Sequence, residues 1–168
     1  MFYGEVFRAL NKARVKYVVA GGVAVVLHGY QRFTKDLDII VALEEKNLAR
    51  LFDALGRVGY GPKVPVTKEA FAAKGQFAKW KKEKGMVVFS FVQKKPPFDL
   101  IDMFIQEPVP FAQLDKEKKK IRVDNVAIPI ASIRHLVGIK KKAGRDKDLN
   151  DVVQLKAIAK FERKKSAR

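Results

Sequence analysis

Two aspartates, Asp36 and Asp38, stand one residue apart in the segment RFTKDLDIIV. If residues 37–41 form a strand, successive side chains point to opposite faces, so both carboxylates lie on the same face. Like charges held this close repel each other unless a cation lies between them, and Mg²⁺ prefers oxygen ligands of this kind. The spacing therefore indicates a candidate metal site, and a solvated strand face is the alternative.

A glycine pair precedes these aspartates. Gly21 and Gly22 separate the apolar segments YVVA and VAVVLHGY. Glycine lets a ligand approach the backbone closely, and the amides at the start of a helix can bind a phosphate. Next to a metal-binding pair of aspartates, the glycines favour a nucleotide site over a turn that merely tolerates glycine.

Two polar residues alternate with the aspartates along the same segment. Arg32 could bind a phosphate through two parallel hydrogen bonds, and Thr34 could orient a metal-bound water. The alternative for both is an ordinary role in a solvated loop or local turn.

Lys140 breaks an apolar helical pattern. In SIRHLVGIKKKA the apolar stripe runs through Ile133, Leu136 and Val137, and Lys140 occupies the next position on it. A charge in place of a core residue indicates either a functional site or a lysine whose stem passes the edge of the core.

Composition limits the other options. The 168 residues contain no cysteine, which excludes disulfides and thiolate metal sites, and two histidines far apart make a histidine zinc site unfavourable. No apolar stretch is long enough to cross a bilayer and no signal-peptide pattern is present, so we expect a cytoplasmic protein without a membrane partner. The net charge of +17 suits either RNA binding or solubility.

Hydrophobic spacing predicts the elements that position these residues. We expect helices over residues 2–14, with Phe2, Val6 and Leu10 on one face, and over 44–58, after Thr67, over 132–142 and over 146–161. Strands are expected at 37–41, 86–93 and 98–105, and as a hairpin over 121–130 that turns at Asp124 and Asn125. The chain is expected to form one domain, residues 1–162, followed by a disordered basic tail, residues 163–168.

The segment GGVAVVLHGYQRFTKDLDIIV resembles the G-G…R-x-T-x-D-x-D signature of the DNA polymerase β-like nucleotidyltransferase superfamily. Within it, the branch of abortive-infection (AbiE-type) toxin nucleotidyltransferases is the most similar. The resemblance continues through FDLIDMFIQEPVPF and through the K-x-x-A-G-R-x-K-D-L-x-D pattern that begins at Lys140. It therefore covers most of the chain.

The resemblance implies an α/β (α+β) nucleotidyltransferase fold, with a mixed sheet flanked by helices and a C-terminal helical pair. In this family three carboxylates hold two Mg²⁺ ions, which bind a nucleoside triphosphate. Asp36 and Asp38 match two of the ligands. Asp99 and Asp102 lie three residues apart and so face opposite sides of a regular strand; the family pattern favours Asp102 as the third catalytic and metal-binding carboxylate.

The same resemblance implies nucleotide-binding roles for the other motif residues, which are Gly21, Gly22, Arg32, Thr34, Lys140, Arg145 and Asp148. Lys140 would contact the triphosphate. Asp148 and Asp151 would support the site. The implied activity is Mg²⁺-dependent transfer of a nucleoside monophosphate to a hydroxyl of tRNA or another RNA, a protein or a small molecule. A toxin-like role with a cognate antitoxin protein would fit this branch. The alternative is a catalytically inactive module of the same fold that binds RNA or protein.

Overall fold

The computed structural model describes residues 3–166, so the predicted role of Phe2 lies outside the described residues. It contains helices α1 (Gly4–Lys12), α2 (Gly21–Leu27), α3 (Glu45–Arg57), α4 (Lys68–Ala72), α5 (Gln76–Lys84), α6 (Phe111–Glu117), α7 (Ile133–Ala143) and α8 (Asp146–Ser166). The strands are β1 (Tyr17–Val19), β2 (Leu37–Val41), β3 (Tyr60–Pro62), β4 (Val88–Gln93), β5 (Leu100–Phe104), β6 (Lys119–Val123) and β7 (Val126–Ile130).

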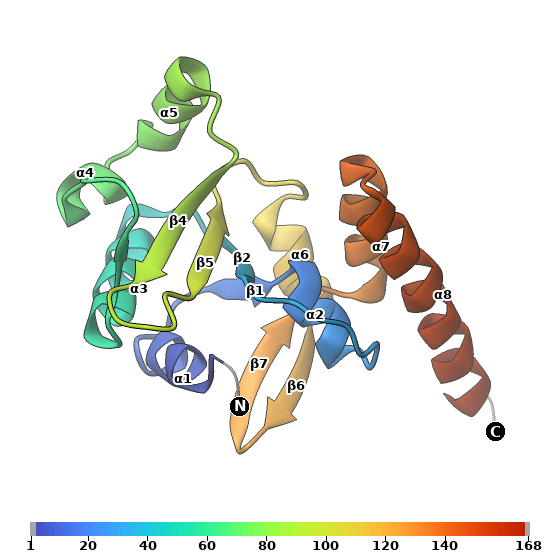
Figure 1. The fold of residues 1–168 in the computed structure, drawn as a ribbon. Coiled ribbons are helices and arrows are strands. Elements are labelled where there is room, and N and C mark those ends of the chain that lie inside the picture. Colours follow the sequence, from blue (N-terminus) through green and yellow to red (C-terminus); the bar gives the residue numbers. More distant parts are fainter. Residues whose placement is uncertain (1–2, 167–168) are drawn as a thin grey trace.

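All seven strands form one mixed sheet in the order β3-β4-β5-β2-β1-β7-β6. The pairs β2–β5 and β1–β7 are parallel and the other neighbours are antiparallel. Helices flank the sheet, and α7 and α8 lie side by side at one end of it (Figure 1). The predicted α/β fold, with a mixed sheet and a C-terminal helical pair, is confirmed.

Strand β2 lies at the centre of the sheet, and side chains of both its faces are buried. Leu37 and Ile39 on one face and Ile40 on the other are fully buried, whereas Asp38 is partly exposed. A central strand covered on both sides reads as a continuous apolar run. Asp38 therefore stands out as a carboxylate placed where a core residue would otherwise pack.

Local signals account for several elements. The β6–β7 hairpin turns at Asp124 and Asn125, both with positive φ, as a two-residue hairpin turn requires. The Thr67 hydroxyl accepts a hydrogen bond from Ala70 N and caps α4. Gly75 is in the left-handed region and divides the predicted single helix into α4 and α5.

The end of the chain differs from the prediction. Helix α8 continues to Ser166, so residues 163–166 are helical rather than a disordered tail, and Ala167–Arg168 lie outside the described residues. Leu155 is the last fully buried residue of α8, and the second half of the helix extends away from the sheet (Figure 1). Strand β3 and helix α6 were not predicted, because both are short. No helix of the described residues is long and apolar enough to cross a membrane.

Candidate active site

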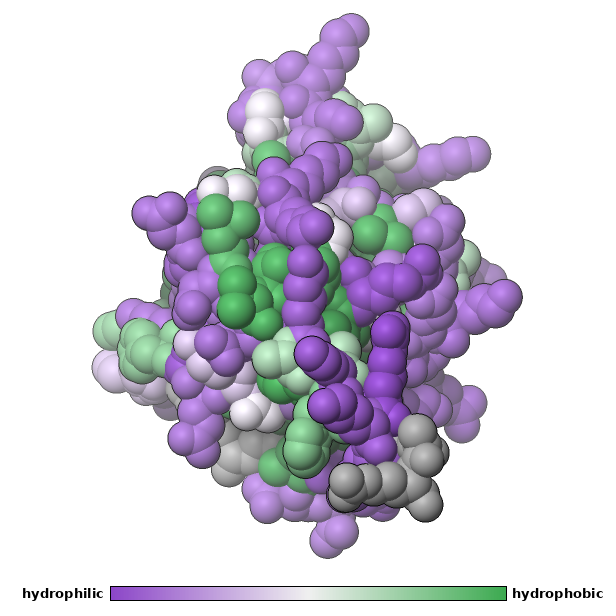
Figure 2. Space-filling view, turned by 90° about the vertical axis from the view of Figure 1, so that its right-hand side faces the viewer, coloured by the Kyte–Doolittle hydropathy of each residue, from purple (hydrophilic) through white to green (hydrophobic). Residues whose placement is uncertain are grey.

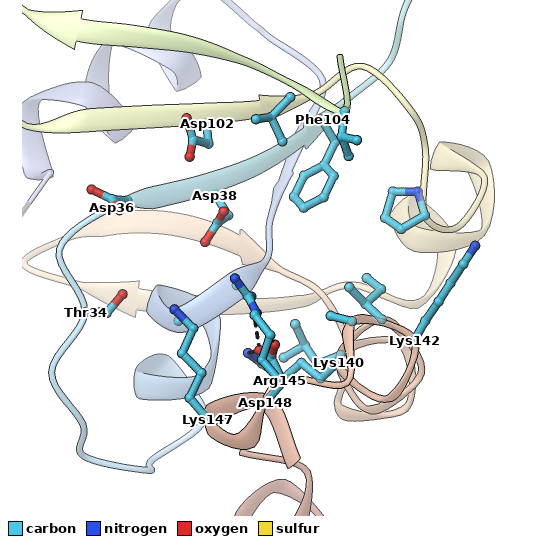
Figure 3. Close-up of a pocket in the computed structure, with 18 of the residues that line it drawn as sticks. Thr34, Asp36, Asp38, Asp102, Phe104, Lys140, Lys142, Arg145, Lys147 and Asp148 are labelled. Carbon is cyan, nitrogen blue, oxygen red and sulfur yellow. Dashed lines mark hydrogen bonds and ion pairs between the residues drawn. The ribbon is translucent and has the colours of Figure 1, made fainter. Parts of the chain in front are cut away.

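A cleft of about 740 Å³ lies between the sheet, near Asp38 of β2 and Asp102 of β5, and the junction of α7 and α8 (Figure 3). The ten residues that we proposed from the sequence as metal-binding or nucleotide-binding line this cleft, whereas Asp151, expected to support the site, does not. The ten residues are Gly21, Gly22, Arg32, Thr34, Asp36, Asp38, Asp102, Lys140, Arg145 and Asp148. The folded chain therefore brings together segments that are more than 100 residues apart in the sequence.

The register of the sheet places two of the carboxylates beside each other. Asp38 of β2 pairs with Asp102 of β5, and Asp102 pairs with Ser90 of β4. The Ser90 hydroxyl donates a hydrogen bond to Asp102 Oδ1 over 2.6 Å. This contact orients the Asp102 carboxylate toward the cleft, and Asp36, just before β2, lines the same space.

Asp99 does not line the cleft. It precedes β5, and its backbone carbonyl accepts a hydrogen bond from Gln93 N. Burial raises the pKa of the Tyr3 and Tyr60 phenols, and the charge of Asp99 acts in the same direction. The structure thus places Asp102, and not Asp99, with Asp36 and Asp38.

Asp38 has an unusual electrostatic environment. Burial raises its pKa to about 6, and the nearby charges of Asp102 and Asp36 act in the same direction. Lys140 and a hydrogen bond from the Gly22 amide oppose this shift without cancelling it. A carboxylate held in this way is costly to ionise, and a bound cation would remove that cost.

The donor set has the chemistry of a Mg²⁺ site, since it offers carboxylate oxygens and negative charge that the cleft only partly neutralises. As placed, however, the carboxylates do not converge: no three His, Cys, Asp or Glu side chains of the described residues are close enough to bind one ion. The Asp36 carboxylate points away from those of Asp38 and Asp102 (Figure 3).

Gly21 and Gly22 are required by the site itself. A Cβ added to Gly21 would lie 1.8 Å from Asp38 Oδ2, and one added to Gly22 would lie 2.4 Å from the Thr34 hydroxyl oxygen. Gly21 also has a φ of +59°, a backbone conformation that residues with a side chain rarely adopt. The glycines therefore leave room for the side chains of the cleft, whether or not their amides also bind a phosphate.

Lys140 is buried, as its position in the apolar stripe requires, but it is not alone there. Its Nζ lies 2.7 Å from Asp151 Oδ2 and 3.2 Å from Asp148 Oδ1, and both aspartates are buried as well. A buried lysine needs such partners, because an unpaired charge in the core is strongly destabilising. Lys140 is thus held by α8 while it borders the cleft.

Two arginines complete this buried network. Arg32 Nη1 lies 2.5 Å from Asp151 Oδ2, and this ion pair connects the loop before β2 to α8. Arg145 Nε lies 2.5 Å from Asp148 Oδ2. Burial alone would raise the pKa of Asp148, but the hydrogen bonds from Arg145 and Lys140 outweigh it and hold that pKa below its usual range.

The structure adds residues that the sequence did not single out as site residues. Lys142 and Lys147 line the cleft, and neither makes an ion pair within residues 3–166. Arg145 and Lys147 point toward the carboxylates from across the cleft (Figure 3). Phe33 also lines the cleft and is 88% exposed. Lys147 is part of the K-x-x-A-G-R-x-K-D-L-x-D pattern, which could have identified it. Lys142 lies in a basic run and Phe33 has no periodic partner, so only the fold distinguishes these two.

Comparison with known proteins supports the fold. No protein-family model and no curated protein sequence matches the chain. Among solved structures, the lincosamide antibiotic adenylyltransferase LnuA, in its lincomycin-bound form, aligns over 94% of this chain and 94% of its own, with a TM-score of 0.60 and 17% identity. The complex of ANT(2″)-Ia with adenylyl-2″-tobramycin aligns over 98% and 97%, with a TM-score of 0.57 and 10% identity.

A third similar structure is an antigenic nucleotidyltransferase-like protein from Paracoccidioides brasiliensis. It aligns over 89% of this chain and 71% of its own, with a TM-score of 0.55 and 14% identity. The chain has the nucleotidyltransferase fold. At these identities the similarity establishes the fold alone, so the function must be argued from the cleft.

Proposed function

We propose that the chain is a nucleotidyltransferase that uses Mg²⁺ and a nucleoside triphosphate. The observation that carries this proposal is the meeting of Asp36, Asp38 and Asp102 with a cationic wall in one cleft of the nucleotidyltransferase fold. In the reaction, the acceptor hydroxyl loses its proton to solvent and its oxygen forms a bond to the α-phosphorus. The bond from that phosphorus to the oxygen shared with the β-phosphorus breaks, and pyrophosphate leaves.

The three aspartates would hold the metal. Asp38 and Asp102 are already adjacent, and Asp36 would complete the set by turning its side chain inward. When bound, Mg²⁺ offsets the charge of the triphosphate and lowers the pKa of the acceptor hydroxyl. Two ions would suit a cleft that must accommodate both the triphosphate and the acceptor.

The cations opposite the aspartates would bind the triphosphate. Arg145, Lys142 and Lys147 border the cleft, and the Arg145 side chain is 63% exposed, so it can reach a ligand while it contacts Asp148. Lys140 is held by two aspartates and serves mainly to position α8 and to moderate the charge on Asp38. We assign Arg32 the matching task of fixing the loop that carries Thr34 and Asp36.

The decisive experiment is incubation of the protein with each α-labelled nucleoside triphosphate, Mg²⁺ and total cellular RNA, protein and small molecules. We expect one triphosphate to label a macromolecule or a small hydroxyl compound, and Asp36→Asn and Asp38→Asn each to abolish labelling with folding intact. Comparable transfer by the wild type and both variants would refute the proposal. The absence of label in every reaction would favour the catalytically inactive module.

Metal binding has a readout that is independent of activity. Because a ligand that binds only the folded state stabilises it, Mg²⁺ should raise the melting temperature of the wild type at neutral pH. Asp38→Asn should remove this effect, since it deletes a charged oxygen ligand. An equal Mg²⁺-induced shift in both proteins would show that the ion binds elsewhere.

The toxin-like role implied by the resemblance belongs to the same proposal. If the acceptor is an essential RNA, expression of the wild type in a bacterial host should slow growth, and Asp38→Asn should not. A gene product that restores growth by binding the wild-type protein would be the cognate antitoxin.

A further inference from the structure

A second concave surface lies outside the cleft, between the first turns of α7, the second half of α8 and the start of β6. We call it the basic groove; its volume is about 1040 Å³. Its cationic side chains are Lys119, Arg134, Lys156, Lys160, Arg163 and Lys164. We propose that the basic groove binds the phosphate backbone of an RNA whose end enters the cleft as the acceptor, an inference that rests on the proposed function.

The positive charge of the basic groove is largely unopposed. Lys119 contacts Glu162 over 2.7 Å, and Arg134 contacts Glu117 outside the groove. The remaining cations, Lys156, Lys160, Arg163 and Lys164, make no ion pair with any described residue and are exposed on α8. Lysine and arginine side chains arranged along a groove can replace the counterions of a polynucleotide, and the release of these counterions favours binding.

The floor of the groove does not add a titrating charge. His28 is buried there, and its Nε2 lies 2.8 Å from the carbonyl oxygen of Ala131, so the neutral ring donates this hydrogen bond. Burial lowers the pKa of His28, and the charge of Lys119 acts in the same direction. At neutral pH the positive charge of the groove therefore comes from lysine and arginine alone, and Glu162 is the acidic residue that lines it.

One segment connects the basic groove to the cleft. His28 lies in the groove, and the Tyr30 hydroxyl accepts a hydrogen bond from Asn150 of α8 over 2.9 Å. Arg32, paired with Asp151 of α8, and Phe33 line the cleft. Residues 28–33 can span at most about 18 Å, so the two surfaces are a short distance apart along α8. A polymer can occupy both surfaces at once, whereas a small hydroxyl compound would occupy only the cleft.

Phe33 is the residue of this connecting segment, residues 28–33, that lies at the cleft. A phenylalanine that is 88% exposed gains nothing from burial, and Phe33 lines the cleft in which the terminal nucleotide of the acceptor would react. A base of a single strand can stack on its ring, as bases do on aromatic residues in single-strand-binding proteins. Proteins recognise RNA chiefly at loops and ends whose bases are unstacked, and this favours RNA over duplex DNA as the occupant.

The face formed by α7 and α8 is in keeping with this partner. Figure 2 shows this side of the molecule, where hydrophilic side chains surround a smaller apolar area. Val153 and Phe161 of α8 are exposed, at 62% and 70%. A protein that covered these apolar side chains would be the competing occupant of the surface, and the experiment below separates the two.

The test compares two variants that lose the same charge. In the groove variant, Lys156→Gln, Lys160→Gln and Arg163→Gln are combined; in the control, Lys79→Gln, Lys82→Gln and Lys84→Gln are combined on α5, which does not line the groove. All six side chains are exposed, so both variants should fold. The probe is a labelled single-stranded RNA of about 20 nucleotides, with DNA of the same sequence beside it, titrated by fluorescence anisotropy at several salt concentrations.

We expect the groove variant to lose at least about tenfold in RNA affinity and its salt slope to fall by about 2, since each lost phosphate contact removes about 0.7 from the slope for a single strand. The control should stay within about twofold of the wild type. Equal losses in the two variants, unchanged affinity in the groove variant, or tighter binding of the DNA would overturn the proposal. A purified protein that binds the exposed face of α8 and is not displaced by RNA would also overturn the proposal.

Failure of this inference and failure of the proposed function give different results. The groove variant leaves the aspartates of the cleft unchanged, so Mg²⁺ should raise its melting temperature as much as that of the wild type. If RNA binding depends on the groove but no triphosphate labels any acceptor, the groove assignment stands and the catalytic proposal fails. If the wild type labels a small hydroxyl compound and the groove variant does so equally well, the catalytic proposal stands and the groove assignment fails.

Discussion

Asp99 and Asp102 lie three residues apart, yet only Asp102 lines the cleft, beside Asp38. Asp102→Asn should therefore cost orders of magnitude in nucleotidyl transfer, whereas Asp99→Asn should cost little. Single-turnover transfer at saturating Mg²⁺ measures both, with circular dichroism to confirm folding. Loss of activity in Asp99→Asn alone would mean that the side chain acting in the site is not the one that the sheet register places there.

Asp38 should limit the stability of the free protein. Its pKa of about 6 in the folded chain lies above the ordinary value, so its ionisation costs stability progressively as the pH rises through this range, and at pH 7 the full cost is present. Asp38→Asn removes it and should raise the free energy of unfolding at neutral pH by about 1–3 kcal/mol.

Urea unfolding at neutral pH and near pH 4, without Mg²⁺, measures this effect. The difference between Asp38→Asn and the wild type should shrink at the lower pH, where the carboxyl is protonated in the folded chain and about half protonated in the unfolded chain. A variant that is less stable than the wild type at neutral pH would contradict the environment described for Asp38.

Phe33 should contribute to substrate binding and not to folding, because it is exposed within the cleft. Phe33→Ala should raise the KM of the nucleotide or of the acceptor about tenfold, in the range expected for loss of one stacked base. Phe33→Trp retains an aromatic surface and should remain close to the wild type. Steady-state kinetics with each substrate varied in turn decides which one stacks, and unchanged KM values in Phe33→Ala would exclude stacking.

At the scale of elements, α8 holds both α7 and the loop before β2 through Asp151. Its carboxylate contacts Lys140 and Arg32. The side chains of Asp151 and Lys140 are buried, and that of Arg32 is mostly buried. Asp151→Asn leaves the buried Lys140 without one of its two partners and should lower the free energy of unfolding by about 3–5 kcal/mol. Asp146→Asn, on the exposed first turn of the same helix, should cost less than about 1 kcal/mol.

The two variants are compared by urea unfolding. Equal small losses would show that Asp148 alone can hold Lys140. A double variant, Lys140→Met with Asp151→Leu, should recover part of the stability, since apolar residues can replace a buried ion pair. Recovery of stability without recovery of transfer would separate the structural role of the pair from its role beside the cleft.

At the scale of the whole molecule, the buried core does not include the second half of α8. The last fully buried residue of α8 is Leu155, and residues 161–165 are exposed. A chain that ends at Lys160 should therefore keep its fold, with a melting temperature within about 5 °C of the full chain. It lacks Arg163 and Lys164 and should bind RNA more weakly. Thermal unfolding followed by circular dichroism tests the first expectation, and a much larger decrease would mean that the end of α8 supports the core.

Much of the site was predictable from local pattern. The alternation around Asp36 and Asp38, the adjacent glycines and the lysine within an apolar stripe each depend on residues a few positions apart, and the period of a strand or helix converts such spacing into a shared face. The hairpin turn at Asp124 and Asn125 was predictable for the same reason, since it rests on the conformations that these two residue types tolerate.

Tertiary structure decided what lies opposite those faces. Only the parallel register of β2 and β5 sets Asp102 beside Asp38, and only the packing of α8 gives Lys140 its partner Asp151 and turns an isolated charge into a buried network. The basic groove likewise joins β6 to the far half of α8, across segments that no periodicity connects. The sequence by itself determined which side chains could do chemistry, because side-chain type and local period are properties of short segments. Which of them meet depends on strand order and helix packing, and these are set by burial summed over the whole chain.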